Sequence, residues 1–140
     1  MTPRLRCGSN TIRVAKVVLD ASAALALLLG EPGADAVKCY LADACISALN
    51  YSEVLARTAR LCGSLEEAKQ RVDRHDLHIV DFDAEQAAVT ASLFPSTRSL
   101  GISLADRACL ALGFSRGWPV ITADHAWAKL DIGVTVVLIR

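Results

Sequence analysis

The sequence lacks the features that mark membrane, zinc-binding and base-stacking proteins. No apolar run reaches the roughly 18–20 residues that cross a bilayer, and no Cys/His cluster has zinc-like spacing. Aromatic residues make up only 5% of the chain, which argues against an extended surface for stacking nucleic-acid bases. Lys+Arg and Asp+Glu balance at 15 each, so any nucleic-acid surface must be a local patch.

Paired cysteines are also missing. The five cysteines form an odd set without a C-x-x-C pair, and we expect them to be reduced and mostly buried. Basic residues before the first apolar stretch resemble a secretory signal, but Asp20 interrupts that stretch, and cleavage would remove the first predicted strand. We therefore expect a cytoplasmic protein that has no membrane association.

What the chain does contain is enough apolar residues for one core. Hydrophobic residues make up 53% of its 140 residues. Residues 1–13 are basic, contain Pro3, Gly8 and Asn10, and lack periodicity, so they predict a disordered tail. Residues 14–140 contain no repeat or linker and predict a single domain.

Short apolar stretches alternate with segments of helical periodicity. Strands are predicted at about residues 16–19, 45–47, 78–80, 119–121 and 134–138. Residues 93–99 are polar and contain Pro95, so they predict an irregular loop. The alternation predicts an α/β protein whose mostly parallel sheet is covered by helices on both faces.

Four acidic residues lie where a predicted strand ends or a helix begins. They are Asp20, Glu53, Asp106 and Asp124. The carboxyl ends of parallel strands share one edge of a sheet, where open α/β sheets bind their ligands. We therefore expect the four carboxylates to meet in one pocket.

Each acid also has a purely structural explanation. Asn50-x-x-Glu53 and Ser103-x-x-Asp106 resemble capping boxes. Asp20 and Asp124 each fit a plain N-cap. Taken together, however, ionised carboxylates in a partly dry pocket persist only if some stay protonated or a cation neutralises them. Oxygen-only ligands favour Mg²⁺ or Mn²⁺.

The acids belong to four motifs that are weak singly and specific together. The motifs are Val-Val-Leu-Asp20-Ala-Ser22-Ala, Asn50-Tyr-Ser-Glu53-Val, Ser103-Leu-Ala-Asp106-Arg-Ala-Cys-Leu-Ala and Val120-Ile-Thr122-Ala-Asp124. In this order and spacing, over residues 16–138, the chain resembles PIN-domain proteins. Among them it is most similar to the VapC-type toxins of VapBC toxin–antitoxin pairs.

The resemblance implies a PIN-like three-layer α/β/α fold with four or five mostly parallel strands in the order 3-2-1-4-5. It also implies a metal-dependent endoribonuclease that hydrolyses RNA phosphodiester bonds with Mg²⁺ or Mn²⁺. Such a toxin is neutralised by a cognate VapB-type antitoxin and forms a homodimer or a higher toxin–antitoxin assembly. The chain differs from these toxins in its lead of 15 residues before the first strand.

The resemblance also assigns roles to the acids. Asp20 and Asp106 are implied as direct ligands of one or two Mg²⁺ ions, and Asp124 as a ligand that binds directly or through water. Glu53 is implied as the fourth catalytic acid, which binds a second ion or orients the attacking water. A metal-bound water is a usable nucleophile near neutral pH.

Polar and basic neighbours complete the expected site. Ser22 and Thr122 match positions that hydrogen-bond the carboxylates, and Asn50 is a companion. The candidate RNA contacts, because phosphate binding rests on Lys and Arg, are Arg57, Arg98 and Arg107.

Two other classes of protein stay open as alternatives. One is a receiver-like phosphoacceptor domain, but Asp20 has no adjacent acid, and Lys129 lies in a predicted helix instead of after a late strand. The other is a non-catalytic PIN-like RNA-binding module, which would normally have lost an acid.

Overall fold

Five parallel strands form the centre of the molecule. The computed structural model describes residues 16–140, so the tail predicted at residues 1–13 lies outside the described residues. The strands are β1 (Val17–Leu19), β2 (Ala44–Ser47), β3 (His78–Val80), β4 (Val120–Thr122) and β5 (Val136–Leu138). Their order across the sheet is β3-β2-β1-β4-β5 with every pair parallel, which confirms the expected topology.

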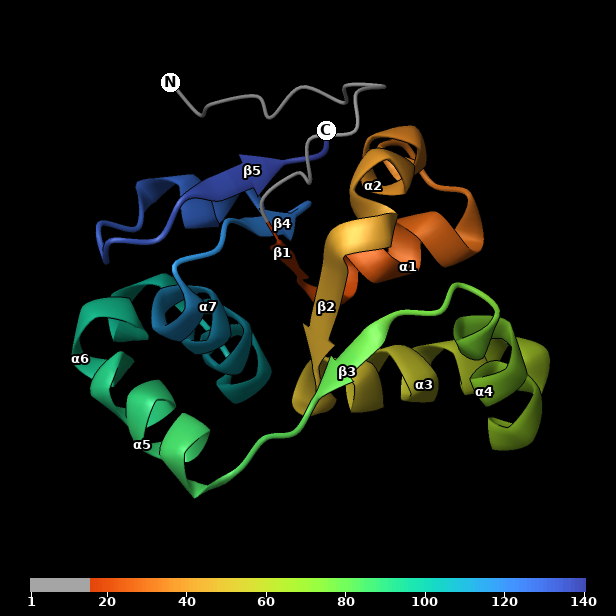
Figure 1. The fold of residues 1–140 in the computed structure, drawn as a ribbon, viewed down its shortest axis with the longest axis horizontal. Coiled ribbons are helices and arrows are strands. Elements are labelled where there is room, and N and C mark those ends of the chain that lie inside the picture. Colours follow the sequence, from red (N-terminus) through yellow and green to blue (C-terminus); the bar gives the residue numbers. More distant parts are fainter. Residues whose placement is uncertain (1–15) are drawn as a thin grey trace.

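Helices cover both faces of the sheet, so the architecture is a three-layer α/β/α sandwich (Figure 1). One layer contains α1 (Ala21–Leu29), α2 (Ala34–Tyr40), α3 (Ala48–Cys62) and α4 (Leu65–Asp73). The other contains α5 (Ala84–Ser92), α6 (Phe94–Thr97) and α7 (Leu104–Arg116). Short 3₁₀ turns complete the described chain at η1 (Leu41–Asp43), η2 (Arg98–Leu100) and η3 (His125–Lys129).

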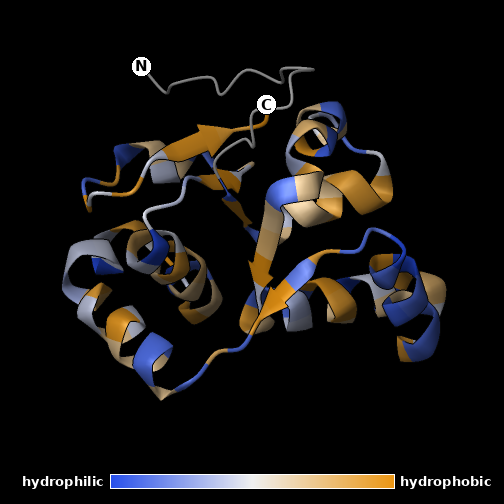
Figure 2. Ribbon diagram, viewed as in Figure 1, coloured by the Kyte–Doolittle hydropathy of each residue, from blue (hydrophilic) through white to orange (hydrophobic). Residues whose placement is uncertain are grey.

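The alternation of side chains along β1 explains why the sheet needs two helical layers. Val17 and Leu19 pack into a cluster with α1 and α2, whereas Val18 packs into a cluster on the α7 side. All three side chains are fully buried. A strand that is buried on both faces has a continuous apolar sequence, as is typical of parallel sheets. Figure 2 shows the same hydrophobic character along β5.

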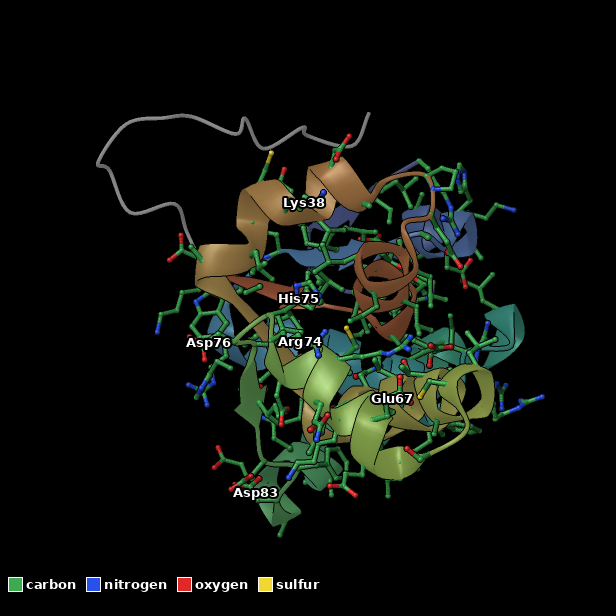
Figure 3. The ribbon with its side chains drawn as sticks, turned by 90° about the vertical axis from the view of Figure 1, so that its right-hand side faces the viewer. Lys38, Glu67, Arg74, His75, Asp76 and Asp83 are labelled. Atoms are coloured by element: carbon green, nitrogen blue, oxygen red, sulfur yellow. The ribbon has the colours of Figure 1, made fainter. Side chains whose placement is uncertain are left out.

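Polar residues gather on the outer surface of the helical layers. In Figure 3, which faces α4, the charged side chains of Lys38, Glu67 and Arg74 lie on or at the ends of helices around this surface. Within residues 16–140, no helix combines the length and apolar character that a bilayer crossing requires.

Two local predictions were wrong. Residues 93–99, expected to be an irregular loop, form α6 and the start of η2. Proline is tolerated in a first helical turn, and the buried Thr97 Oγ1 donates to the Leu93 carbonyl at 2.7 Å. The supposed capping box at Asn50 is also absent, because α3 begins three residues earlier, where Ser47 Oγ accepts from Leu49 N at 3.4 Å.

Candidate active site

The four predicted acids line one cavity of about 210 Å³ at the carboxyl edge of the sheet. Asp20 follows β1 directly, and Asp124 lies two residues after β4. Glu53 is in the second turn of α3, which follows β2, and Asp106 is in the first turn of α7. Residues separated by up to 104 positions therefore meet because parallel strands end at the same edge.

Asp20 is the anchored member of this group. It is only 4% exposed, and its Oδ2 accepts hydrogen bonds from Ser22 Oγ at 2.6 Å and Thr122 Oγ1 at 2.9 Å. These hydroxyls in turn accept from the backbone N–H groups of Ala123 at 2.9 Å and Asp124 at 3.0 Å. Each hydroxyl has one proton to donate, so both hydroxyls donate to the same carboxylate oxygen, Oδ2 of Asp20.

The other carboxylate oxygen of Asp20 has no such support. Oδ1 is buried, and it has no hydrogen-bond partner among residues 16–140. Burial raises the pKa of Asp20, the hydrogen bonds from Ser22 and Thr122 oppose that rise, and the charge of Asp106 adds to it. An unpaired oxygen in this setting is costly unless a proton or a cation compensates it.

Glu53 responds to the same negative environment. Partial burial raises its pKa, the charges of Asp20 and Asp106 raise it further, and the Arg57 guanidinium opposes the rise. The charge of Asp106 therefore raises the pKa of both Asp20 and Glu53, which supports a shared site rather than independent helix caps.

Asp106 and Asp124 combine a local structural role with their place in the cavity. Asp106 Oδ2 accepts from Ser103 N at 3.1 Å while Ser103 Oγ accepts from Asp106 N at 3.2 Å, so the predicted capping box is present. Asp124 Oδ1 accepts from Ala126 N at 2.9 Å and caps η3. In each case one carboxylate oxygen caps the turn and the other has no protein donor in the described part of the chain.

Asn50 is buried and does not line the cavity. Its side chain is fully buried in the first turn of α3, and neither amide atom has a hydrogen-bond partner in the described chain. Asn50 is not among the residues that line the acidic cavity. Its expected contact with the acids is thus not seen.

The candidate RNA-binding arginines separate into different settings. Arg57 lines the cavity. Arg107 donates from Nη1 to the Ile102 carbonyl at 2.7 Å and lies 5.0 Å from the Phe94 ring centroid, so it has a structural use. Arg98 is exposed on η2 and does not line the cavity.

Two charged residues at the cavity were missed by the sequence analysis. Glu31 and Arg140 both line it, and Arg140 Nη1 contacts Glu31 Oε2 at 3.3 Å. Arg140 lies two residues after β5, the same spacing that Asp124 has after β4, so the rule that placed Asp124 at the carboxyl edge would also have placed Arg140 there.

The donor set fits a hard divalent cation. Five carboxylate residues line the cavity, namely the four predicted acids and Glu31, and Asp20 Oδ1 is a buried oxygen that lacks a partner among residues 16–140. Within residues 16–140, no three acidic, histidine or cysteine side chains approach one another closely enough to form a ready-made metal cluster. The acids thus share a cavity without forming a closed ligand shell.

The comparison with protein families identifies the family to which this fold belongs. The PIN domain profile matches residues 17–133, which is most of the chain. The chain therefore belongs to the PIN domain family. No curated protein sequence matches the chain significantly.

Solved structures with similar folds include chains of toxin–antitoxin complexes. A chain of DNA-bound VapBC from Salmonella typhimurium is 16% identical, with a TM-score of 0.72 and coverage of 91% of this chain and 100% of that chain. A chain of a toxin–antitoxin complex from Klebsiella pneumoniae is 17% identical, with a TM-score of 0.71 and coverage of 89% of this chain and 98% of that chain. A chain of VapBC-5 from Mycobacterium tuberculosis is 24% identical, with a TM-score of 0.58 and coverage of 91% of this chain and 99% of that chain. At these identities the similarity shows a shared fold.

Proposed function

We propose that this protein is a Mg²⁺-dependent endoribonuclease of the VapC toxin type. The observation that carries the proposal is the convergence of Asp20, Glu53, Asp106 and Asp124 on one cavity at the carboxyl edge of a PIN fold. The structurally similar chains come from toxin–antitoxin complexes, which supports the toxin assignment.

Asp20 is the central ligand in this proposal. Ser22 and Thr122 fix its Oδ2, so its unpartnered Oδ1 is held in a single orientation. Asp106 and Asp124 contribute the carboxylate oxygens that their caps leave free. Bound Mg²⁺, or Mn²⁺ in its place, would neutralise the acids and lower the pKa of a coordinated water.

Glu53 has the properties of a general base that accepts the proton of the attacking water. Its raised pKa makes the carboxylate a stronger base than an ordinary glutamate. In the proposed hydrolysis, the water oxygen bonds to phosphorus and its proton passes to Glu53. The bond to the leaving ribose oxygen breaks, and that oxygen takes a proton from solvent. Arg57 lines the cavity with Glu53 and is placed to contact a phosphate.

The biological setting follows from the same proposal. We expect the protein to act in the cytoplasm on cellular RNA, as a homodimer or within a larger toxin–antitoxin assembly. A VapB-type antitoxin would silence it by covering the acidic cavity. The free thiols of Cys45, Cys62 and Cys109 are in keeping with a reducing compartment.

An RNA-cleavage assay tests the activity and its metal requirement. Purified protein incubated with total cellular RNA and Mg²⁺ should give discrete fragments. EDTA should abolish them, and excess Mg²⁺ should restore them, because the carboxylates need a cation to approach a phosphodiester. Cleavage that survives EDTA would refute the metal dependence. A metal-replete protein that binds RNA pools but cuts none would favour the non-catalytic RNA-binding module.

A further inference from the structure

Arg140 is held at the acidic cavity from several sides. The backbone N–H of Ile139 donates to the Thr122 carbonyl at 3.0 Å, which extends the β4–β5 pairing to the cavity edge. His125 Nε2 donates to the Arg140 carbonyl at 2.6 Å. Arg140 Nη1 donates to Glu31 Oε2 at 3.3 Å and to the Pro32 carbonyl at 2.9 Å. These contacts fix the position of the Arg140 guanidinium at the edge of the cavity.

The turn between α1 and α2 is shaped to make this contact. Gly33 has a φ of +98°, and a Cβ placed on it would lie 2.8 Å from the Ile139 carbonyl oxygen. Only glycine lets the turn pack this closely against the chain that leaves β5. The close approach brings Glu31 and the Pro32 carbonyl next to Arg140.

The contacts of Arg140 leave most of its hydrogen-bonding capacity unused. A guanidinium has five N–H donors, of which two belong to Nη1. Among residues 16–140, no acceptor contacts Nε or Nη2 of Arg140. This pair of nitrogens is the fork that binds a phosphate through two parallel hydrogen bonds. The ion pair with Glu31 therefore orients the guanidinium through Nη1 and leaves Nε and Nη2 able to bind a phosphate.

The sheet order places Arg57 and Arg140 on opposite flanks of the acids. Arg57 lies on α3, after β2, and Arg140 follows β5, while Asp20 and Asp124 follow the two strands between them. All four side chains line the same cavity. A cation on each side of an acidic centre matches a nucleic-acid backbone that crosses the cavity and presents a phosphate to each cation.

We propose that Arg140 is a substrate-positioning residue that binds a phosphate adjacent to the scissile one, on the β5 side of the cavity. Glu31 is its counter-ion and restrains RNA affinity by repelling the same phosphate. Arg57 binds on the β2 side. The RNA backbone then runs across the ends of β2, β1, β4 and β5. This inference takes its RNA substrate from the proposed function.

The two members of the ion pair should have opposite effects on RNA binding. The probe is a fluorescein-labelled single-stranded RNA of twelve nucleotides and mixed sequence, with Ca²⁺ in place of Mg²⁺. Arg140→Gln should weaken binding about tenfold and lower the slope of log Kd against log salt by about 0.7, the value of one single-strand phosphate contact. Glu31→Gln should tighten binding about threefold, because it removes a negative charge facing the phosphate.

The matched control is Arg71→Gln. Arg71 also pairs with a glutamate, Glu67 on α4 (Figure 3), but it does not line the acidic cavity. This variant should leave both the affinity and the salt slope unchanged. Thermal melts of all the variants check that each is folded.

The outcomes separate this inference from the proposed nuclease activity. A purely structural ion pair would give Arg140→Gln and Glu31→Gln defects of the same sign with an unchanged salt slope, and that result would overturn the inference. Absence of RNA binding by the unmodified chain would overturn it as well. If the opposite effects appear but no RNA is cut with Mg²⁺, the inference holds and the nuclease proposal fails.

Discussion

Replacing Asp20 with asparagine should lower RNA cleavage by about 10³-fold or more, since each ~1.4 kcal/mol of lost transition-state stabilisation costs a factor of ten. Asparagine keeps the size of the side chain and an oxygen that can accept from Ser22 and Thr122. It removes the negative charge that the cation requires. The measurement is the rate of fragment formation from total RNA under saturating Mg²⁺.

The same substitution should stabilise the metal-free fold. Asp20 is buried with one oxygen unpartnered, so removing its charge should raise the free energy of unfolding by about 1–2 kcal/mol at neutral pH. The folded-state pKa is raised above the ordinary 3.8. The folded protein therefore holds this proton more tightly than the unfolded chain, and stability declines as pH rises from 3.8 through the raised pKa. Asp20→Asn should remove that decline.

This pair of effects distinguishes a functional carboxylate from a structural one. A residue kept only for stability loses activity because the fold weakens. Asp20→Asn is expected to lose activity while the melting temperature in EDTA rises. A variant that both melts earlier and cuts less would assign Asp20 a structural role and remove it from the catalytic site.

Replacing Thr122 with valine should lower cleavage by about 10–100-fold, the usual cost of removing a residue that orients a ligand. The Thr122 hydroxyl donates to Asp20 Oδ2 and accepts from the Asp124 backbone, so its loss frees two of the acids at once. Valine keeps the β-branched shape of threonine, so the main change at this buried position is the loss of the hydroxyl. The effect should appear as a higher Mg²⁺ concentration for half-maximal cleavage.

Thr122→Ser is the matched control because serine keeps the hydroxyl and loses only a methyl group. We expect it to retain the Mg²⁺ dependence of the unmodified protein. If the serine and valine variants need the same Mg²⁺ concentration, the hydroxyl does not position Asp20, and the hydrogen bonds of Thr122 have no role in cation binding.

Much of the site follows from the sequence because strand ends are local features. The apolar stretch before Asp20 and the one before Thr122 each predict a buried strand, and parallel strands leave their following residues at one edge. Ser103 and Asp106 show that a helix cap and a place in the cavity are compatible, since the capping box and the shared cavity are both present.

The parts that the sequence analysis missed depend on packing between distant segments. Glu31 meets Arg140 only because Gly33 lets its turn press against Ile139, and no sequence spacing encodes a contact across 109 positions. Asn50 was misplaced for a local reason, because Ser47 and not Asn50 caps α3, so Asn50 falls inside the first helical turn. Tertiary contact decided the role of Glu31, and the choice between two nearby caps decided that of Asn50.

The most direct test of the account is the position of a bound Mn²⁺ ion, found by anomalous scattering from a crystal soaked in MnCl₂. We predict Mn²⁺ in the acidic cavity, bonded to Asp20 Oδ1 and to at least one of the carboxylates of Asp106 and Asp124. Asp20→Asn crystals soaked in the same way should lack it. Mn²⁺ bound elsewhere, or retained in the cavity without Asp20, would contradict the claim that this carboxylate anchors the catalytic cation.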